Sequence, residues 1–200
     1  LLNKIKDSGY DVMLGGFDTS CIEKCQNWGA EFAEIPFARA GMNPIQDAKT
    51  LRVYYRMMKE GQFDIVHSYT AKPNIYGSIA AKWAGIKRIY PTVNGLGYAF
   101  TGNSTKNKMV RAVICMLYKW AFSGATKVFF QNSDDAAELV RRGVLPQEKC
   151  VVIAGSGIDL NTFPYSEVCQ ENTFFLATRL LVTKGVRTYF EAAKIVKEKH

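Results

Sequence analysis

Residues 64–93, DIVHSYTAKPNIYGSIAAKWAGIKRIYPTV, decide the fold class of this chain. The stretch opens with a strand-like run, DIVH, continues with a helix that starts at Pro73, and ends with a second strand-like run, RIYPTV. Two strands separated by a helix-length segment indicate a βαβ unit with parallel strands. The same alternation continues toward both ends of the chain, so we expect an α/β fold with a parallel sheet flanked by helices on both faces.

Caps and apolar spacing predict further elements. Asn43-Pro44 predicts the start of a long helix, because asparagine caps helices and proline fits the first turn. The apolar spacing of that helix predicts a buried face made of Ile45, Ala48, Leu51, Tyr55 and Met58. We expect other helices over 1–7, 21–28, 105–123 and from Asp134, and other strands over 10–16, 31–37, 126–131 and 150–154.

The pattern divides the chain into two unequal parts. Residues 1–160 form a first α/β domain, 161–172 form a linker, and 173–200 begin a second domain with one strand, TFFLAT over 173–178, and one helix. One strand and one helix are too few for a core, and the first part begins on a helix with no strand before it. We therefore expect a fragment that lacks the first strand of one domain and most of the other.

Composition argues against several classes of protein. The net charge of +8 is spread along the chain, so nucleic acid is not an expected partner. The longest apolar run, 112–118, is far shorter than the roughly 20 residues that span a membrane. The five cysteines are scattered, as is typical of reduced thiols in a cytoplasmic protein, and no histidine near Cys21 and Cys25 completes a metal site.

Residues 91–102, PTVNGLGYAFTG, place a glycine-rich loop after the second strand. Gly95 and Gly97 match the first two glycines of a dinucleotide-binding loop. Phe100 occupies the place of the third glycine, so the residues alone support a phosphate site only weakly.

Two polar residues follow the DIVH strand. His67 stands at the edge where parallel sheets bind ligands, and it is either a polar strand end or a hydrogen-bond donor and proton shuttle. Lys72 precedes the Pro73 helix, where its cation opposes the helix dipole unless it meets an anion or extends into water.

Cations also gather near the C-terminus. Arg179, Lys184 and Arg187 flank the start of the last helix, and the next acid is Glu191. A helix start prefers anions, so this set indicates either a phosphate site or a solvated cluster.

The helix over 105–123 is basic and has no acid. Helical spacing predicts Val110, Ile114, Leu117 and Ala121 as its core face, with Lys108, Arg111 and Lys119 on the other side beside Cys115 and Phe122. This pattern is typical of an ordinary half-buried helix, and the alternative is a basic patch that faces an anionic membrane.

Four stretches in this order, DIVHSYTAKPNIYGSIAAKWAG, PTVNGLGYAFTG, GSGIDLNTF and TRLLVTKGV, resemble the family 4 glycosyltransferases of the GT-B architecture. The likeness is greatest to bacterial members that extend lipid-linked oligosaccharides. It implies an N-terminal acceptor-binding Rossmann-like domain over 1–160 and the start of a nucleotide-sugar domain over 173–200. It also implies a cytoplasmic protein, or one peripheral on the cytoplasmic face of the inner membrane.

The resemblance implies transfer of a sugar from a nucleoside-diphosphate sugar, UDP in particular, with retention and without a metal cofactor. The acceptor would be a glycan or a polyprenyl-diphosphate-linked sugar of cell-surface polysaccharide synthesis. The catalytic residues would be Arg179 and Lys184, which neutralise the donor diphosphate. The acceptor cleft would contain His67, Lys72, Asn94, Gly95 and Gly97, and the donor-side loop Ser156 and Gly157.

This sequence departs from the family pattern at Asn94, where many members have histidine, and at Thr178, where glycine is usual. The acidic donor motif of the family is absent, so we expect the chain alone to be inactive. Two alternatives stay open: a GT-B nucleotide-sugar epimerase, and a non-enzymatic partner- or lipid-binding protein.

Overall fold

The computed structural model describes residues 2–36, 43–102, 104–167 and 173–199. The chain divides into two compact units, Leu1–Gly157 and Ile158–His200. The boundary after residue 160, and the assignment of the second part to a nucleotide-sugar domain, stay predictions.

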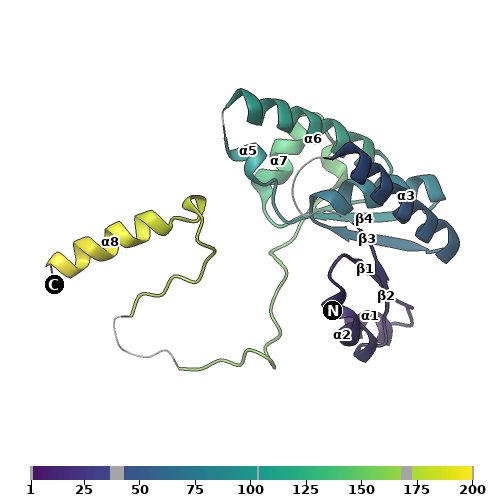
Figure 1. The fold of residues 1–200 in the computed structure, drawn as a ribbon. Helices are drawn as coiled ribbons and strands as arrows, with labels where there is room; N and C mark the ends of the chain where they lie inside the picture. Colours follow the sequence, from purple (N-terminus) through teal and green to yellow (C-terminus); the bar gives the residue numbers. More distant parts are fainter. Residues whose placement is uncertain (1, 37–42, 103, 168–172, 200) are drawn as a thin grey trace. The chain divides into compact units, whose positions relative to one another are not determined.

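The first unit contains two parallel sheets (Figure 1). The smaller sheet pairs β1 (Met13–Gly16) with β2 (Glu31–Glu34), and its helical segments are α1 (Leu2–Asp7), η1 (Thr19–Cys21) and α2 (Ile22–Asn27). The strands of the larger sheet lie in chain order: β3 (Ile65–Tyr69), β4 (Arg88–Val93), β5 (Val128–Phe130) and β6 (Cys150–Val152). Every neighbouring pair is parallel, which confirms the α/β fold with parallel strands flanked by helices.

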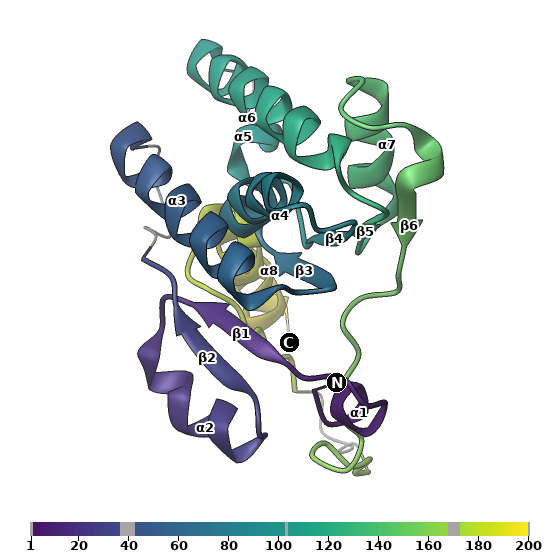
Figure 2. The same cartoon turned by 90° about the vertical axis from the view of Figure 1, so that its right-hand side faces the viewer.

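The helices of the larger sheet precede its first strand or connect its strands. They are α3 (Pro44–Gly61), the π-helix η2 (Pro73–Gly77), α4 (Ser78–Ala84), α5 (Tyr98–Thr101), α6 (Thr105–Ser123), α7 (Ser133–Arg141) and η3 (Gln147–Lys149). Figure 2 shows α3, α4 and α6 side by side on one face of β3 and β4, and these helices contact one another in that order. Ile65, His67 and Tyr69, which alternate along β3 with its more buried residues, are exposed.

The core of the first unit lies between these helices and the sheet. One buried cluster is built around Tyr118 and Phe122 of α6 and Phe130 of β5. A second joins Tyr54 and Met58 of α3 to other apolar residues. Burial of this apolar surface supplies the main free energy that holds the helices on the sheet.

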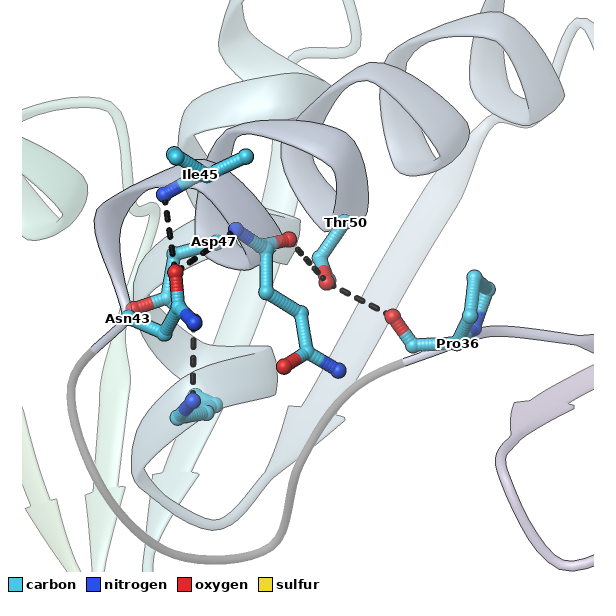
Figure 3. A network of polar contacts seen from close by, with 7 residues as sticks. Pro36, Asn43, Ile45, Asp47 and Thr50 are labelled. Carbon is cyan, nitrogen blue, oxygen red and sulfur yellow. Dashed lines mark hydrogen bonds and ion pairs between the residues drawn. The ribbon is translucent and has the colours of Figure 1, made fainter.

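The predicted buried face of α3 is wrong in part. Ile45, Ala48 and Tyr55 are exposed, whereas Met58 is buried and Leu51 is half-buried, as expected. The other buried residues of this helix are Asp47, Thr50 and Tyr54. The buried Thr50 hydroxyl is satisfied, because its one hydrogen is shared between the carbonyls of Pro36, at 2.7 Å, and Gln46, at 3.0 Å (Figure 3). The cap at the helix start is confirmed, since Asn43 Oδ1 accepts from the amides of Ile45 and Gln46.

The predicted orientation of α6 is also wrong in part. Phe122, expected beside the lysines, is almost fully buried together with Tyr118. Val110, Ile114 and Leu117 are only half-buried. The helix therefore turns Tyr118 and Phe122 toward the core, where their large side chains bury the most apolar area.

The second unit contains η4 (Val182–Lys184) and α8 (Val186–Lys199). The strand expected over 173–178 is not formed, which is a correction to the prediction. A strand needs a hydrogen-bonded neighbour, and the described residues of this unit offer none. Part of the predicted linker, 168–172, lies outside the described residues.

Candidate functional site

The carboxyl ends of β3 and β4 bring the candidate residues of the first unit together. The strands are adjacent and parallel, and His67 of β3 is paired with Tyr90 of β4, two residues before Thr92. His67 Nε2 and Thr92 Oγ1 are 2.8 Å apart and share a hydrogen bond. Ligands of parallel sheets bind beyond this edge, which makes it the candidate functional site.

A buried polar network supports this edge from below. Ser68 Oγ donates to Asn74 Oδ1 at 2.8 Å, and Asn74 Nδ2 donates to the carbonyl of Thr92 at 2.8 Å. Asn74 is 0% exposed. Each hydrogen bond therefore satisfies a group that would otherwise be buried without a partner. None of the predicted site residues belongs to this network, although an asparagine inside an otherwise apolar helix is a signal in the sequence for a buried hydrogen bond.

The turn between β3 and η2 is strained. Thr70 has φ of 70°, a left-handed conformation that is unusual for a β-branched residue. The amide of Asn74 donates to the carbonyl of Thr70 at 3.0 Å, and a π-helix follows at once. Strained turns and π-helices are both enriched at functional sites, and here they adjoin His67.

Lys72 does not extend into water. Its ammonium donates to Asp47 Oδ1 of α3 at 2.8 Å, and both side chains are largely buried. Tyr76 also hydrogen-bonds Asp47, and its burial together with this carboxylate raises its pKa to about 12. Lys72 thus ties the strained turn to α3, and its predicted place in an acceptor cleft stays a prediction.

His67 is exposed, and its pKa is lowered. Its ring stacks on Tyr69 with centroids 4.5 Å apart and lies 5.9 Å from Phe129. Partial burial among these rings lowers the pKa of His67, so the imidazole is neutral near pH 7. A neutral imidazole can accept a proton or donate a hydrogen bond to a hydroxyl.

A cavity of about 260 Å³ lies against β3. Its polar wall includes His67 and Ser68, and its apolar wall includes Tyr54 and Met57 of α3. Polar groups that face an otherwise apolar hollow are typical of small-molecule sites.

The glycine-rich loop follows β4 at the same edge. Asn94, Gly95 and Gly97 are exposed, whereas Leu96 and Phe100 pack against the core. Gly97 has φ of 77°, which a residue with a side chain adopts only under strain. The loop is therefore anchored by its apolar residues and presents its backbone and the Asn94 amide to solvent.

The predicted donor-side loop lies beyond β6. Ser156 Oγ accepts from Gln131 Nε2 at 2.8 Å, and Gly157 has φ of 70°. Both residues are exposed, so the hydrogen bond orders the loop without covering it.

In the second unit, Arg179, Lys184 and Arg187 flank the start of α8 and are exposed. Within the described part of the chain, none of their side chains has a hydrogen-bond or ion-pair partner. Their charges are thus available to an anion near a helix start.

The three residues predicted to form a membrane patch, Lys108, Arg111 and Lys119, differ in burial and in contacts. Arg111 Nε donates to the carbonyl of Ala99 at 2.9 Å, Nη2 donates to that of Gly102 at 2.5 Å, and the guanidinium lies over the ring of Phe100. Arg111 therefore fastens α5 to α6 and is half-buried. Lys108 and Lys119 are exposed.

Among the described residues, no group of three or more His, Cys, Asp or Glu side chains is arranged to hold a metal ion. None of the helices that these residues form has the length and apolar character needed to cross a membrane.

Two bacterial proteins are similar in sequence along much of this chain. One is the N,N'-diacetylbacillosaminyl-diphospho-undecaprenol alpha-1,3-N-acetylgalactosaminyltransferase of Campylobacter jejuni, 29% identical over all of this chain and 56% of its own length. Another is the UDP-Gal:alpha-D-GlcNAc-diphosphoundecaprenol alpha-1,3-galactosyltransferase of Escherichia coli, 30% identical over 64% of this chain and 32% of its own length. The chain thus spans about half, or less, of the relatives it matches.

Solved structures show the same fold. MurG of Acinetobacter baumannii covers 78% of this chain with a TM-score of 0.50 and 16% identity, and the match spans 40% of MurG. A putative UDP-N-acetylglucosamine 2-epimerase of Listeria monocytogenes covers 74% with a TM-score of 0.50 and 10% identity, and the match spans 39% of its chain. The sequence model of the Glycosyl transferase 4-like family matches residues 1–132, about two thirds of the chain. This chain therefore belongs to the Glycosyl transferase 4-like family.

Proposed function

We propose that this chain is part of a glycosyltransferase that moves a sugar from a nucleoside-diphosphate sugar, UDP in particular, to a polyprenyl-diphosphate-linked acceptor, with retention and without a metal cofactor. The names of both relatives support the acceptor class, since each contains an undecaprenol-linked diphosphate sugar. The name of the Escherichia coli relative supports a UDP-sugar donor. The product would enter cell-surface glycan synthesis at the cytoplasmic face of the inner membrane.

The observation that carries this proposal is the ordered edge at the carboxyl ends of β3 and β4. His67 is held against Thr92, Asn74 braces the turn beneath it, and the Asn94–Gly97 loop lies exposed at the same edge. Hydroxyl recognition needs fixed hydrogen-bonding groups of this kind beside an accessible surface. We assign this edge to the acceptor, and we assign Ser156 and Gly157 to the donor-side loop.

Arg179 and Lys184 are assigned to the donor diphosphate. In the reaction, the bond between the anomeric carbon and the diphosphate oxygen breaks while the acceptor oxygen bonds to that carbon, and the acceptor proton passes to the leaving diphosphate. Negative charge grows on the leaving diphosphate, so cations that face it stabilise the transition state more than the ground state. The exposure of both side chains supports this role.

The test is Lys184→Ala in the complete gene product, assayed for transfer from candidate UDP-sugars to a polyprenyl-diphosphate-linked acceptor. We expect turnover to fall about 100-fold or more, the loss typical of removing one charge-stabilising donor, while the KM for acceptor stays the same. Lys194→Ala, an exposed lysine further along α8, is the matched control. Unchanged turnover would remove Lys184 from the donor site, and conversion of UDP-sugar without acceptor would favour the epimerase.

A further inference from the structure

The outer face of α6 is apolar along its centre. Met109, Met116 and Trp120 are 67%, 63% and 46% exposed. At about 100° per residue, they lie within about 20° of one line along the helix. Lys106 lies on one flank of this line, and Lys108 and Lys119 on the other. A surface helix normally turns its apolar residues toward the core and its polar residues toward water, so this exposed apolar line is unusual.

The apolar line continues onto the neighbouring helices. Trp83 of α4 is 49% exposed, and its ring meets that of Trp120 edge to face with centroids 5.6 Å apart. A shallow hollow between α3 and α4 is lined by Trp83, Tyr55 and Arg52, among others. We name the Trp–Met surface by its five exposed members: Tyr55, Trp83, Met109, Met116 and Trp120. An exposed apolar patch that crosses three helices marks a contact surface.

The charge around this surface has one sign. The outer face of α3 presents four exposed cations at helical spacing: Lys49, Arg52, Arg56 and Lys59. None of these four side chains has an ion-pair partner among the described residues. The carboxylates on α3, α4 and α6 are Glu60 and the buried, paired Asp47. These cations beside the Trp–Met surface are complementary to an anionic surface.

We propose that the Trp–Met surface docks on an anionic lipid bilayer. Trp83, Trp120 and the two methionines enter the boundary between headgroups and acyl chains, where tryptophan is favoured. The cations of α3, with Lys106, Lys108 and Lys119 of α6, contact the headgroups. Arg111, half-buried between α5 and α6, takes no part.

Co-sedimentation of the full chain with vesicles tests the proposal. We compare vesicles of phosphatidylcholine alone with vesicles that contain phosphatidylglycerol as well, and expect binding only to the second. The triple variant Arg52→Glu, Arg56→Glu, Lys59→Glu should bind at least about 100-fold more weakly, since each cation near such a surface contributes about 1 kcal/mol. The matched control is Lys194→Glu, Lys197→Glu, Lys199→Glu on α8, and equal loss in both triples would overturn the proposal.

Fluorescence tests the apolar part, because the chain has three tryptophans and Trp28, at the C-terminal cap of α2, lies outside the Trp–Met surface. Brominated acyl chains should quench Trp83 and Trp120 but not Trp28, as read from variants that keep one tryptophan each. Trp120→Ser should weaken vesicle binding about tenfold, and Trp28→Ser should leave it unchanged. Quenching of Trp28 alone would overturn the proposal.

Two other outcomes would also contradict it. Vesicle binding that does not depend on the phosphatidylglycerol content would show that the cations do not contact anionic headgroups. A concentration-dependent dimer, abolished by Trp120→Ser and seen without lipid, would assign the surface to a second copy of the chain. The measurements need neither donor nor acceptor sugar, so their failure leaves the proposed transfer reaction standing.

Discussion

The turn after β3 and the loop before α8 use polar residues in opposite ways. In the turn, Asn74, Lys72 and Ser68 are buried or nearly so, and each is paired. Before α8, Arg179 and Lys184 are exposed, without a side-chain partner among the described residues. Buried polar groups contribute to stability through their partners, whereas exposed charges contribute little to stability and stay free to bind. The polar residues of the turn after β3 therefore stabilise the fold, whereas the cations before α8 remain free to bind an anion.

The largest effect on stability should come from breaking the Lys72–Asp47 pair. Lys72→Met leaves the Asp47 carboxylate buried without its cation, and we expect the unfolding free energy to fall by about 3 kcal/mol. Urea denaturation of the full chain measures it. Adding Asp47→Leu should restore much of the loss, and a single variant as stable as the parent would contradict the role of the pair.

Removing the buried amide should have the next largest effect. Asn74→Ala removes the acceptor of the Ser68 hydroxyl and the side-chain donor to the Thr92 carbonyl, and we expect it to lower the unfolding free energy by about 2 kcal/mol in urea denaturation. Ser78→Ala is the matched control, because the Ser78 hydroxyl is buried nearby and has no hydrogen-bond partner in the described part of the chain. We expect this control to be as stable as the parent, or more so. Equal losses in the two variants would show that volume, not hydrogen bonding, matters here.

Relief of the strained turn should raise stability. Thr70→Gly removes the side chain that makes φ of 70° unfavourable, and we expect a gain of about 1 kcal/mol in the unfolding free energy. Gln62→Gly, at a φ of 47° in an unbranched residue, should gain less. A loss in the thermal midpoint of Thr70→Gly would show that the threonine side chain supports the turn.

Protonation of His67 should make a smaller, pH-dependent contribution to the unfolding free energy. Its pKa is lowered in the fold, so the unfolded chain binds the proton more readily. Stability should therefore be unaffected well above pH 6.5 and should fall as the pH drops below about 6.5 toward the folded pKa. His67→Gln should flatten this part of the profile, as followed by the thermal midpoint. An unchanged profile would mean that another group causes the slope.

The smallest effect on stability should come from the exposed cations. Arg179→Ala and Lys184→Ala should leave the urea midpoint of the chain unchanged, because exposed substitutions without contacts rarely alter stability. A clearly lower urea midpoint in either variant would show that the side chain makes a structural contact. The loop before α8 would then resemble the turn after β3 in this respect.

Sequence by itself determined the local features of this protein. The helix predicted over 105–123 has those bounds in the structure, the Asn43 cap forms, and strands occur in all but one of the places that alternation indicates. These features depend on near neighbours: a cap accepts hydrogen bonds from amides two or three residues away, and periodic apolar residues mark an amphipathic element. The four motifs likewise indicated the family that the comparisons show.

Tertiary structure alone decided which residues are buried and with whom. Asp47 and Thr50 replaced Ile45 and Tyr55 on the buried face of α3 because Lys72 and the carbonyl of Pro36 satisfy them. Such partners lie far along the chain, and burial of a polar group is favourable only once its partner is in place. The strand expected over 173–178 failed for the same kind of reason, since a ladder needs a second strand and the described second unit has none.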